Sequence, residues 1–163
     1  MNVESFEDIK VLMDNFDPAS LLPDLTNVVG IVEFITRIAV LIGPIVLLTM
    51  GILYLFAAPK EANYRFGYRC FFGMGSEEAW RFTQRLAGVV WSALGIILTA
   101  VMAIISTGFD GKDTAQIIGS AMSCIIWEAA LAILSSIAIN TVVALNFDAK
   151  GELRKKQPEA SET

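Results

Sequence analysis

Three long stretches without a charged residue dominate the pattern of hydrophobic and polar positions along the chain. They cover residues 38–59, 86–109 and 115–147, and Glu128 is the one charged residue that interrupts the last of them. About 20 consecutive apolar residues in an α-helix cross the hydrocarbon core of a bilayer, and each stretch is at least that long. The pattern therefore predicts an all-α integral membrane protein with three transmembrane helices.

Polar residues and prolines place the ends of these helices. The first helix is predicted over about 26–58, with a kink at Pro44, because proline removes a backbone hydrogen bond inside a helix. The second begins directly after Ser76, a residue type that caps helix N-termini well. The third follows the short turn 108–113 and continues to about residue 146. The second and third helices should then form an antiparallel hairpin.

The chain divides into three parts. Residues 1–25 are acidic, and their apolar positions recur at helical spacing, which predicts an amphipathic N-terminal segment. Residues 26–147 form the three-helix membrane domain. Residues 148–163 carry mixed charge and hold no apolar stretch to fold on, so we expect a charged C-terminal tail.

The charge balance and the lack of histidine argue against several classes of protein. A formal net charge of −5 disfavours a nucleic-acid partner. With no histidine, and with Cys70 and Cys124 far apart, neither a metal nor another cofactor is expected. The sequence shows no nucleophile–base pair and no phosphate-binding loop. We therefore do not expect an enzyme.

Lysine and arginine are distributed unevenly over the connecting segments. Five lie within residues 60–85 and four within the C-terminal tail, against three in the rest of the chain. The positive-inside rule then puts the loop 67–80 and the C-terminus in the cytoplasm, and the N-terminus outside. We expect a multi-pass protein of the cell membrane, in contact with membrane lipid.

The segment 63–88 carries the most specific motif of the chain. It reads Asn63, Phe66-Gly67-Tyr68-Arg69, a short loop, Ser76-Glu77-Glu78, Trp80, Gln84 and Gly88. Over about residues 56–106 the chain resembles the SdpI-like family, the sporulation-delaying-protein immunity family of bacterial membrane proteins. The resemblance implies an integral membrane protein that protects the producing cell against a secreted peptide toxin. Its best-known member also draws a cytoplasmic repressor to the membrane.

Within this segment we expect five residues to bind a partner: Tyr68, Arg69, Ser76, Trp80 and Arg81. Arginine and aromatic residues are enriched where partners bind, and Arg69 offers a donor fork for a carboxylate or a lipid phosphate. In the alternative interpretation, Arg69 pairs with Glu77 or Glu78 or caps a helix. Trp80 would then be an anchor at the membrane interface.

Glu128 is a second candidate site, because a carboxyl group inside an apolar run is costly and often functional. In the hairpin it falls level with Gly95, which belongs to a stripe of small residues on the second helix. We expect a neutral carboxyl that donates a hydrogen bond to Ser92 or Thr99; a proton or ligand site is the other interpretation. If Glu128 lines a path, the protein would instead be a small accessory subunit of a larger membrane transporter or channel complex.

Overall fold

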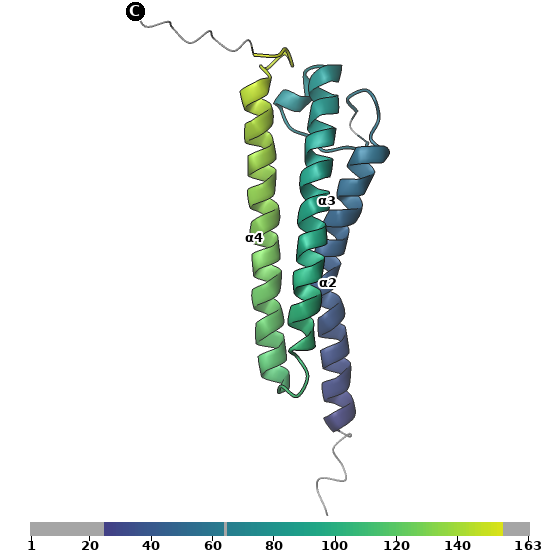
Figure 1. The fold of residues 1–163 in the computed structure, drawn as a ribbon, viewed down its shortest axis with the longest axis vertical. Coiled ribbons are helices and arrows are strands. Elements are labelled where there is room, and N and C mark those ends of the chain that lie inside the picture. The colour runs from purple at the N-terminus through teal and green to yellow at the C-terminus, as the bar shows by residue number, and fades with distance from the viewer. Residues whose placement is uncertain (1–24, 64, 155–163) are drawn as a thin grey trace, which may run out of the picture.

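A computed structural model describes residues 25–63 and 65–154, which fold into three long helices lying side by side (Figure 1). The helices and the short 3-10 turn are α2 (Leu25–Phe56), η2 (Phe72–Met74), α3 (Glu77–Thr107) and α4 (Thr114–Asn146). Within the described residues, the extended pairing is limited to an isolated β-bridge. The all-α prediction is confirmed, and the predicted amphipathic segment lies outside the described residues.

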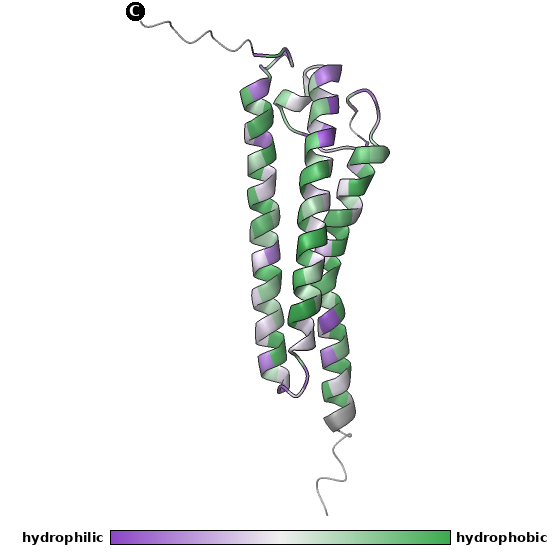
Figure 2. Ribbon diagram, viewed as in Figure 1, coloured by the Kyte–Doolittle hydropathy of each residue, from purple (hydrophilic) through white to green (hydrophobic). Residues whose placement is uncertain are grey.

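The three long helices have the length and composition of membrane spans. The candidate spans are Val28–Phe56, Glu77–Thr107 and Thr114–Asn146. Figure 2 shows apolar residues along most of each helix and many of the polar residues near the two ends of the bundle. Large apolar side chains such as those of Phe34, Ile104 and Trp127 stay exposed on the outer faces. Lipid would cover these faces, so the chain is a multi-pass membrane protein.

Helices α3 and α4 both begin at local caps, and the sequence predicts the cap at Ser76. The Ser76 hydroxyl accepts a hydrogen bond from the Ala79 N–H at 3.1 Å, and the Asp113 carboxylate accepts one from the Gln116 N–H at 2.8 Å. These bonds satisfy backbone donors that the first helical turn leaves free. Below, the end of the bundle that holds residues 57–76 is called the loop end, and the end that holds turn 108–113 the turn end.

Helix α3 makes its most extensive contacts with α2, and its small residues allow this close approach. A Cβ atom at Gly95 would lie 2.5 Å from the backbone nitrogen of Leu48, and one at Gly88 would lie 2.6 Å from Leu55 Cγ. The predicted stripe of small residues therefore packs against α2. Side chains at these positions would push the two helices apart.

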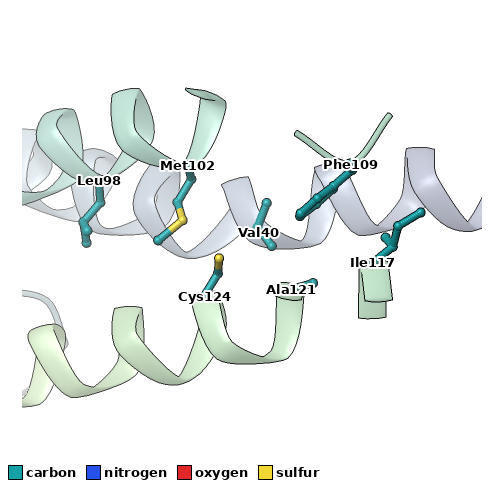
Figure 3. Close-up of a cluster of buried hydrophobic side chains, with 7 residues drawn as sticks. All are labelled: Val40, Leu98, Met102, Phe109, Ile117, Ala121 and Cys124. Carbon is teal, nitrogen blue, oxygen red and sulfur yellow. The ribbon is translucent and has the colours of Figure 1, made fainter. Parts of the chain in front are cut away.

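The bundle buries one apolar cluster toward each end. The turn-end cluster combines side chains from α2, α3, α4 and the turn (Figure 3): Val40, Leu98, Met102, Phe109, Ile117, Ala121 and Cys124. At the same end, Arg37 pairs with Glu33 as its i,i+4 spacing allows, and also with Asp110 at 2.5 Å. The second pair ties α2 to the α3–α4 turn.

Candidate functional site at the loop end

The loop between α2 and α3 is fixed in place around the ring of Trp80. This side chain is fully buried, and its indole N–H donates to the Pro59 carbonyl at 2.8 Å, just beyond the end of α2. Gly67 packs on the ring with φ of 124°, and a Cβ atom there would lie 2.6 Å from the Trp80 ring. Glycine suits this position because it tolerates positive φ and leaves room for the ring.

Gln84 on α3 holds the next residue of the loop by its backbone. The Tyr68 N–H donates to Gln84 Oε1 at 2.7 Å, and Gln84 Nε2 donates to the Tyr68 carbonyl at 2.7 Å. Gln84 is buried, so these two bonds satisfy backbone groups that water cannot easily reach. One amide side chain thereby replaces the pairing that a neighbouring strand would offer.

The side chain of Tyr68 extends this attachment to the other helices. Its hydroxyl contacts Asn140 Oδ1 at 3.0 Å and donates toward the Ser136 carbonyl at 3.2 Å, both on α4. Its ring makes edge contacts with those of Tyr54 on α2 and Trp91 on α3. A phenol is already neutral at neutral pH, and burial raises the pKa of Tyr68 further, so its hydroxyl stays a neutral donor.

Asn63 shapes the start of the same loop. Its side-chain oxygen accepts hydrogen bonds from the N–H groups of Arg65 and Phe66 at 2.9 and 3.0 Å. Such turns are typical of asparagine, because its short side chain reaches backbone groups two or three residues later. The motif residues Asn63, Gly67 and Gln84 thus have a common effect, which is to set the path of the loop.

Ser76 joins the loop end to the C-terminal part of the chain. Besides capping α3, its hydroxyl donates to the Gly151 carbonyl at 2.6 Å. Gly151 has φ of 77° and packs so closely on Gly75 and Ser76 that a Cβ atom would collide with their backbone. No pattern in the sequence predicts this contact.

Residues 147–154 form a compact segment, here called the C-terminal hook. Phe147 and Leu153 form the β-bridge, and the Asp148 carboxylate accepts hydrogen bonds from the N–H groups of Lys150 and Glu152 at 2.9 and 2.8 Å. Phe147 is buried, and its ring packs at a tilt against that of Phe82 on α3. We expected no folded structure beyond residue 147. These local bonds and the contact of Gly151 with Ser76 instead give residues 148–154 a defined structure.

The loop end presents a second set of side chains to its surroundings. Arg69, Phe71 and Arg81 are exposed, and Arg81 pairs with Glu77 at 2.5 Å. An open pocket of about 470 Å³ lies nearby, with Lys60, Arg81 and Arg85 among its lining residues. Of the five predicted partner-binding residues, Arg69 and Arg81 are therefore accessible, Ser76 is half-buried, and Tyr68 and Trp80 point inward.

Glu128 lies away from this surface, in the membrane-spanning part of α4, and is 6% exposed. Its carboxyl faces α2, because a Cβ atom at Gly43 would lie 2.5 Å from Glu128 Oε2. The expected hydrogen bond to Ser92 or Thr99 does not form. The Thr99 hydroxyl donates to the carbonyl of Gly95, and Ser92 Oγ has no partner among the described residues. The stripe that bears both residues is occupied by α2 instead.

The chain matches the SdpI/YfhL protein family over residues 60–144. It belongs to this family. Searches of curated proteins and of solved structures find no match. The family match extends the resemblance carried by the motif through all but the last two residues of α4, so it includes both Tyr68 and its partner Asn140.

The matched region of this SdpI/YfhL protein contains the folded loop, the hairpin and Glu128, whereas α2 and the C-terminal hook lie outside it. Both α2 and the C-terminal hook contact the matched region: Gly43 of α2 lies against Glu128, and Gly151 of the hook lies against Ser76. No group of three or more acidic or cysteine side chains suited to a metal ion occurs within residues 25–63 and 65–154.

Proposed function

We propose that this chain is a non-catalytic immunity protein of a bacterial membrane, which protects the cell that makes it against a secreted peptide toxin. The observation that carries the proposal is the SdpI/YfhL family match, which covers the loop and the hairpin together. The local geometry supports binding in preference to catalysis. The polar groups of Tyr68, Trp80 and Gln84 are engaged in holding the loop.

The surface that we propose for partner binding is the exposed part of the loop end around Arg69 and Arg81. Arginine provides a planar donor fork for carboxylates or phosphates. Tyr68, Ser76 and Trp80 would contribute by fixing the loop that presents these side chains. A peptide toxin is one candidate partner, and a cytoplasmic repressor that the same surface recruits is the other.

The side of the membrane that the loop end faces decides between these partners. We propose that it faces the cytoplasm, because residues 60–85 carry five lysine or arginine residues. In a background that lacks Cys70, Phe71→Cys should react with an impermeant thiol reagent in inverted vesicles, and Lys112→Cys should react in intact cells. Both residues are exposed in the structure. The reverse pattern of labelling would overturn the orientation.

Protection itself can be measured in a bacterium that the sporulation-delaying peptide kills. Cells expressing the chain should survive exposure to the purified peptide better than cells carrying an empty vector. Arg69→Ala should lose this advantage, and Arg69→Lys should lose much of it because a point charge does not reproduce the fork. Arg65→Ala is the matched control, since Arg65 is also exposed and lies four residues earlier in the loop.

Membrane protein levels must be measured in the same cells. Trp80→Ala removes a buried ring and a hydrogen bond, so it should lower the amount of folded protein, with a cost of about 3–5 kcal/mol. Wild-type protein that is present in the membrane without improving survival would refute the immunity proposal for this peptide. Arg69→Ala that protects fully at normal levels would refute the assignment of the surface.

A further inference from the structure

The carboxyl group of Glu128 is buried in the middle part of α4, and among the described residues it forms no ion pair and its Oε1 has no hydrogen-bond partner. The other oxygen occupies the space that a side chain at Gly43 would fill. A buried, unpaired carboxylate is unfavourable in an apolar medium, whereas the protonated acid is tolerated far better. The site thus favours an acid that holds a proton.

Helix α2 adds a backbone feature at the same level. Pro44 follows Gly43 directly, is fully buried, and has no N–H to donate to the carbonyl of Val40 in the preceding turn. The helix therefore offers, one turn from Gly43, a carbonyl that lacks its usual helical donor. Such a carbonyl can accept a hydrogen bond from a protonated carboxyl group.

The groups on each element around Glu128 offer no cation to hold it ionised. On α2 the nearest ionisable residue is Arg37, six positions from Gly43 and already paired with Glu33 and Asp110. On α3, residues 86–107 carry no charge. On α4 itself the neighbouring titratable group is the thiol of Cys124, one turn away.

The surroundings of Glu128 differ toward the two ends of the bundle. Toward the turn end lies the apolar cluster of Figure 3, which includes Cys124, Met102 and Val40. Toward the loop end, two helical turns from Gly43 and Glu128, lie Gly51 and Ser136. Gly51 packs on Ser92, whose hydroxyl is buried and has no partner among the described residues.

Further polar groups lie between Ser92 and the loop. The indole N–H of Trp91 is likewise buried without a partner among the described residues, and its ring contacts that of Tyr68. The Tyr68 hydroxyl in turn contacts Ser136 and Asn140. These hydroxyl, indole and amide groups lie among the apolar side chains of the loop-end cluster, whereas the turn-end cluster next to Glu128 contains no hydroxyl or amide side chain.

We propose that Glu128 is an intramembrane proton-binding site that exchanges its proton with the loop end of the bundle. Gly43 provides the space for the carboxyl, and the apolar cluster at Cys124 separates it from the turn end. The site goes beyond the proposed immunity function, and its test does not depend on any toxin.

Dicyclohexylcarbodiimide provides the probe, because it partitions into lipid and reacts with protonated carboxyl groups to give a stable N-acylurea. We expect mass spectrometry of the purified, reconstituted protein to find the adduct on Glu128. The labelling rate should fall by about tenfold per pH unit once the carboxyl ionises. Glu33 is the internal control, because its ion pair with Arg37 should keep it unreactive. Glu128→Gln should lose the adduct while retaining its helical circular dichroism.

Sidedness is tested in sealed vesicles whose inner and outer pH are set separately. The labelling rate should follow the pH on the loop side, which the accessibility of Phe71→Cys identifies. A rate that follows the pH of the turn side would overturn the proposed route. Absence of a Glu128 adduct in acid, or a rate independent of pH, would overturn the site itself. Peptide mapping of the wild-type protein decides this even if Glu128→Gln fails to fold.

Discussion

The reciprocal hydrogen bonds between Gln84 and the backbone of Tyr68 allow a direct test of how the loop is held. Gln84→Leu keeps a side chain of similar size but removes both bonds, which measure 2.7 Å each. The Tyr68 N–H and carbonyl would then lack hydrogen-bond partners, beside the buried side chain at position 84. Each unsatisfied buried group costs about 1–3 kcal/mol, so we expect about 2–6 kcal/mol for the pair.

This loss should appear as local opening of the loop. A change of about 1.4 kcal/mol corresponds to a tenfold change in an equilibrium constant, so exchange of the Tyr68 amide should accelerate by roughly 30-fold to 10⁴-fold. Hydrogen exchange followed by mass spectrometry of the loop peptide in nanodiscs measures this. Gln116→Leu is the matched control, because Gln116 is exposed at the turn end and its substitution should leave the loop unchanged.

The pH dependence of Gln84→Glu distinguishes the two hydrogen bonds. An ionised carboxylate still accepts from the Tyr68 N–H but has no hydrogen to donate to the carbonyl. The folded loop then favours the protonated glutamate, which can make both bonds. Protection of the loop in Gln84→Glu should therefore be greater in acid than at neutral pH. Loop protection that is equal in Gln84→Leu and wild type would refute the proposed clamp.

Two further predictions concern helix packing and the hook. Gly95→Ala places a Cβ atom 2.5 Å from the backbone nitrogen of Leu48, so it should reduce the free energy of unfolding in mixed micelles by about 1–3 kcal/mol. Gly119→Ala, which meets no atom within 4 Å, should not, and equal losses would contradict the packing. The N–H of Glu152 helps to lower the pKa of Asp148, so the hook should be stable above the ordinary carboxyl pKa and loosen as the pH falls through the lowered value. Exchange of the Glu152 amide measures this, and protection that persists in strong acid would count against it.

The sequence determined the features that depend on neighbouring positions along the chain. Uninterrupted apolar runs indicated three spanning helices, because a helix satisfies its own backbone within lipid. Ser76 indicated where α3 begins, because its hydroxyl accepts a hydrogen bond from an N–H three residues later.

The motif was visible in the sequence, but the direction of its side chains was not. Trp80 and Tyr68 looked like surface residues because they stand beside arginines at a membrane boundary. The structure buries both, since Gly67 brings the loop against the Trp80 ring and Gln84 binds the loop backbone. The contact of Gly151 with Ser76 joins residues 75 positions apart, and no local pattern marks it.

The neighbour of Glu128 was likewise decided by the tertiary structure. Helical spacing showed that Gly95 and Ser92 share a stripe, but that stripe could pack against either of two helices. In the structure the stripe packs against α2, where Leu48 lies close to Gly95. The carboxyl of Glu128 lies against Gly43 of the same helix. Periodicity identifies the faces of a helix, because it depends on one chain segment at a time. Which faces meet depends on how three helices pack together at once.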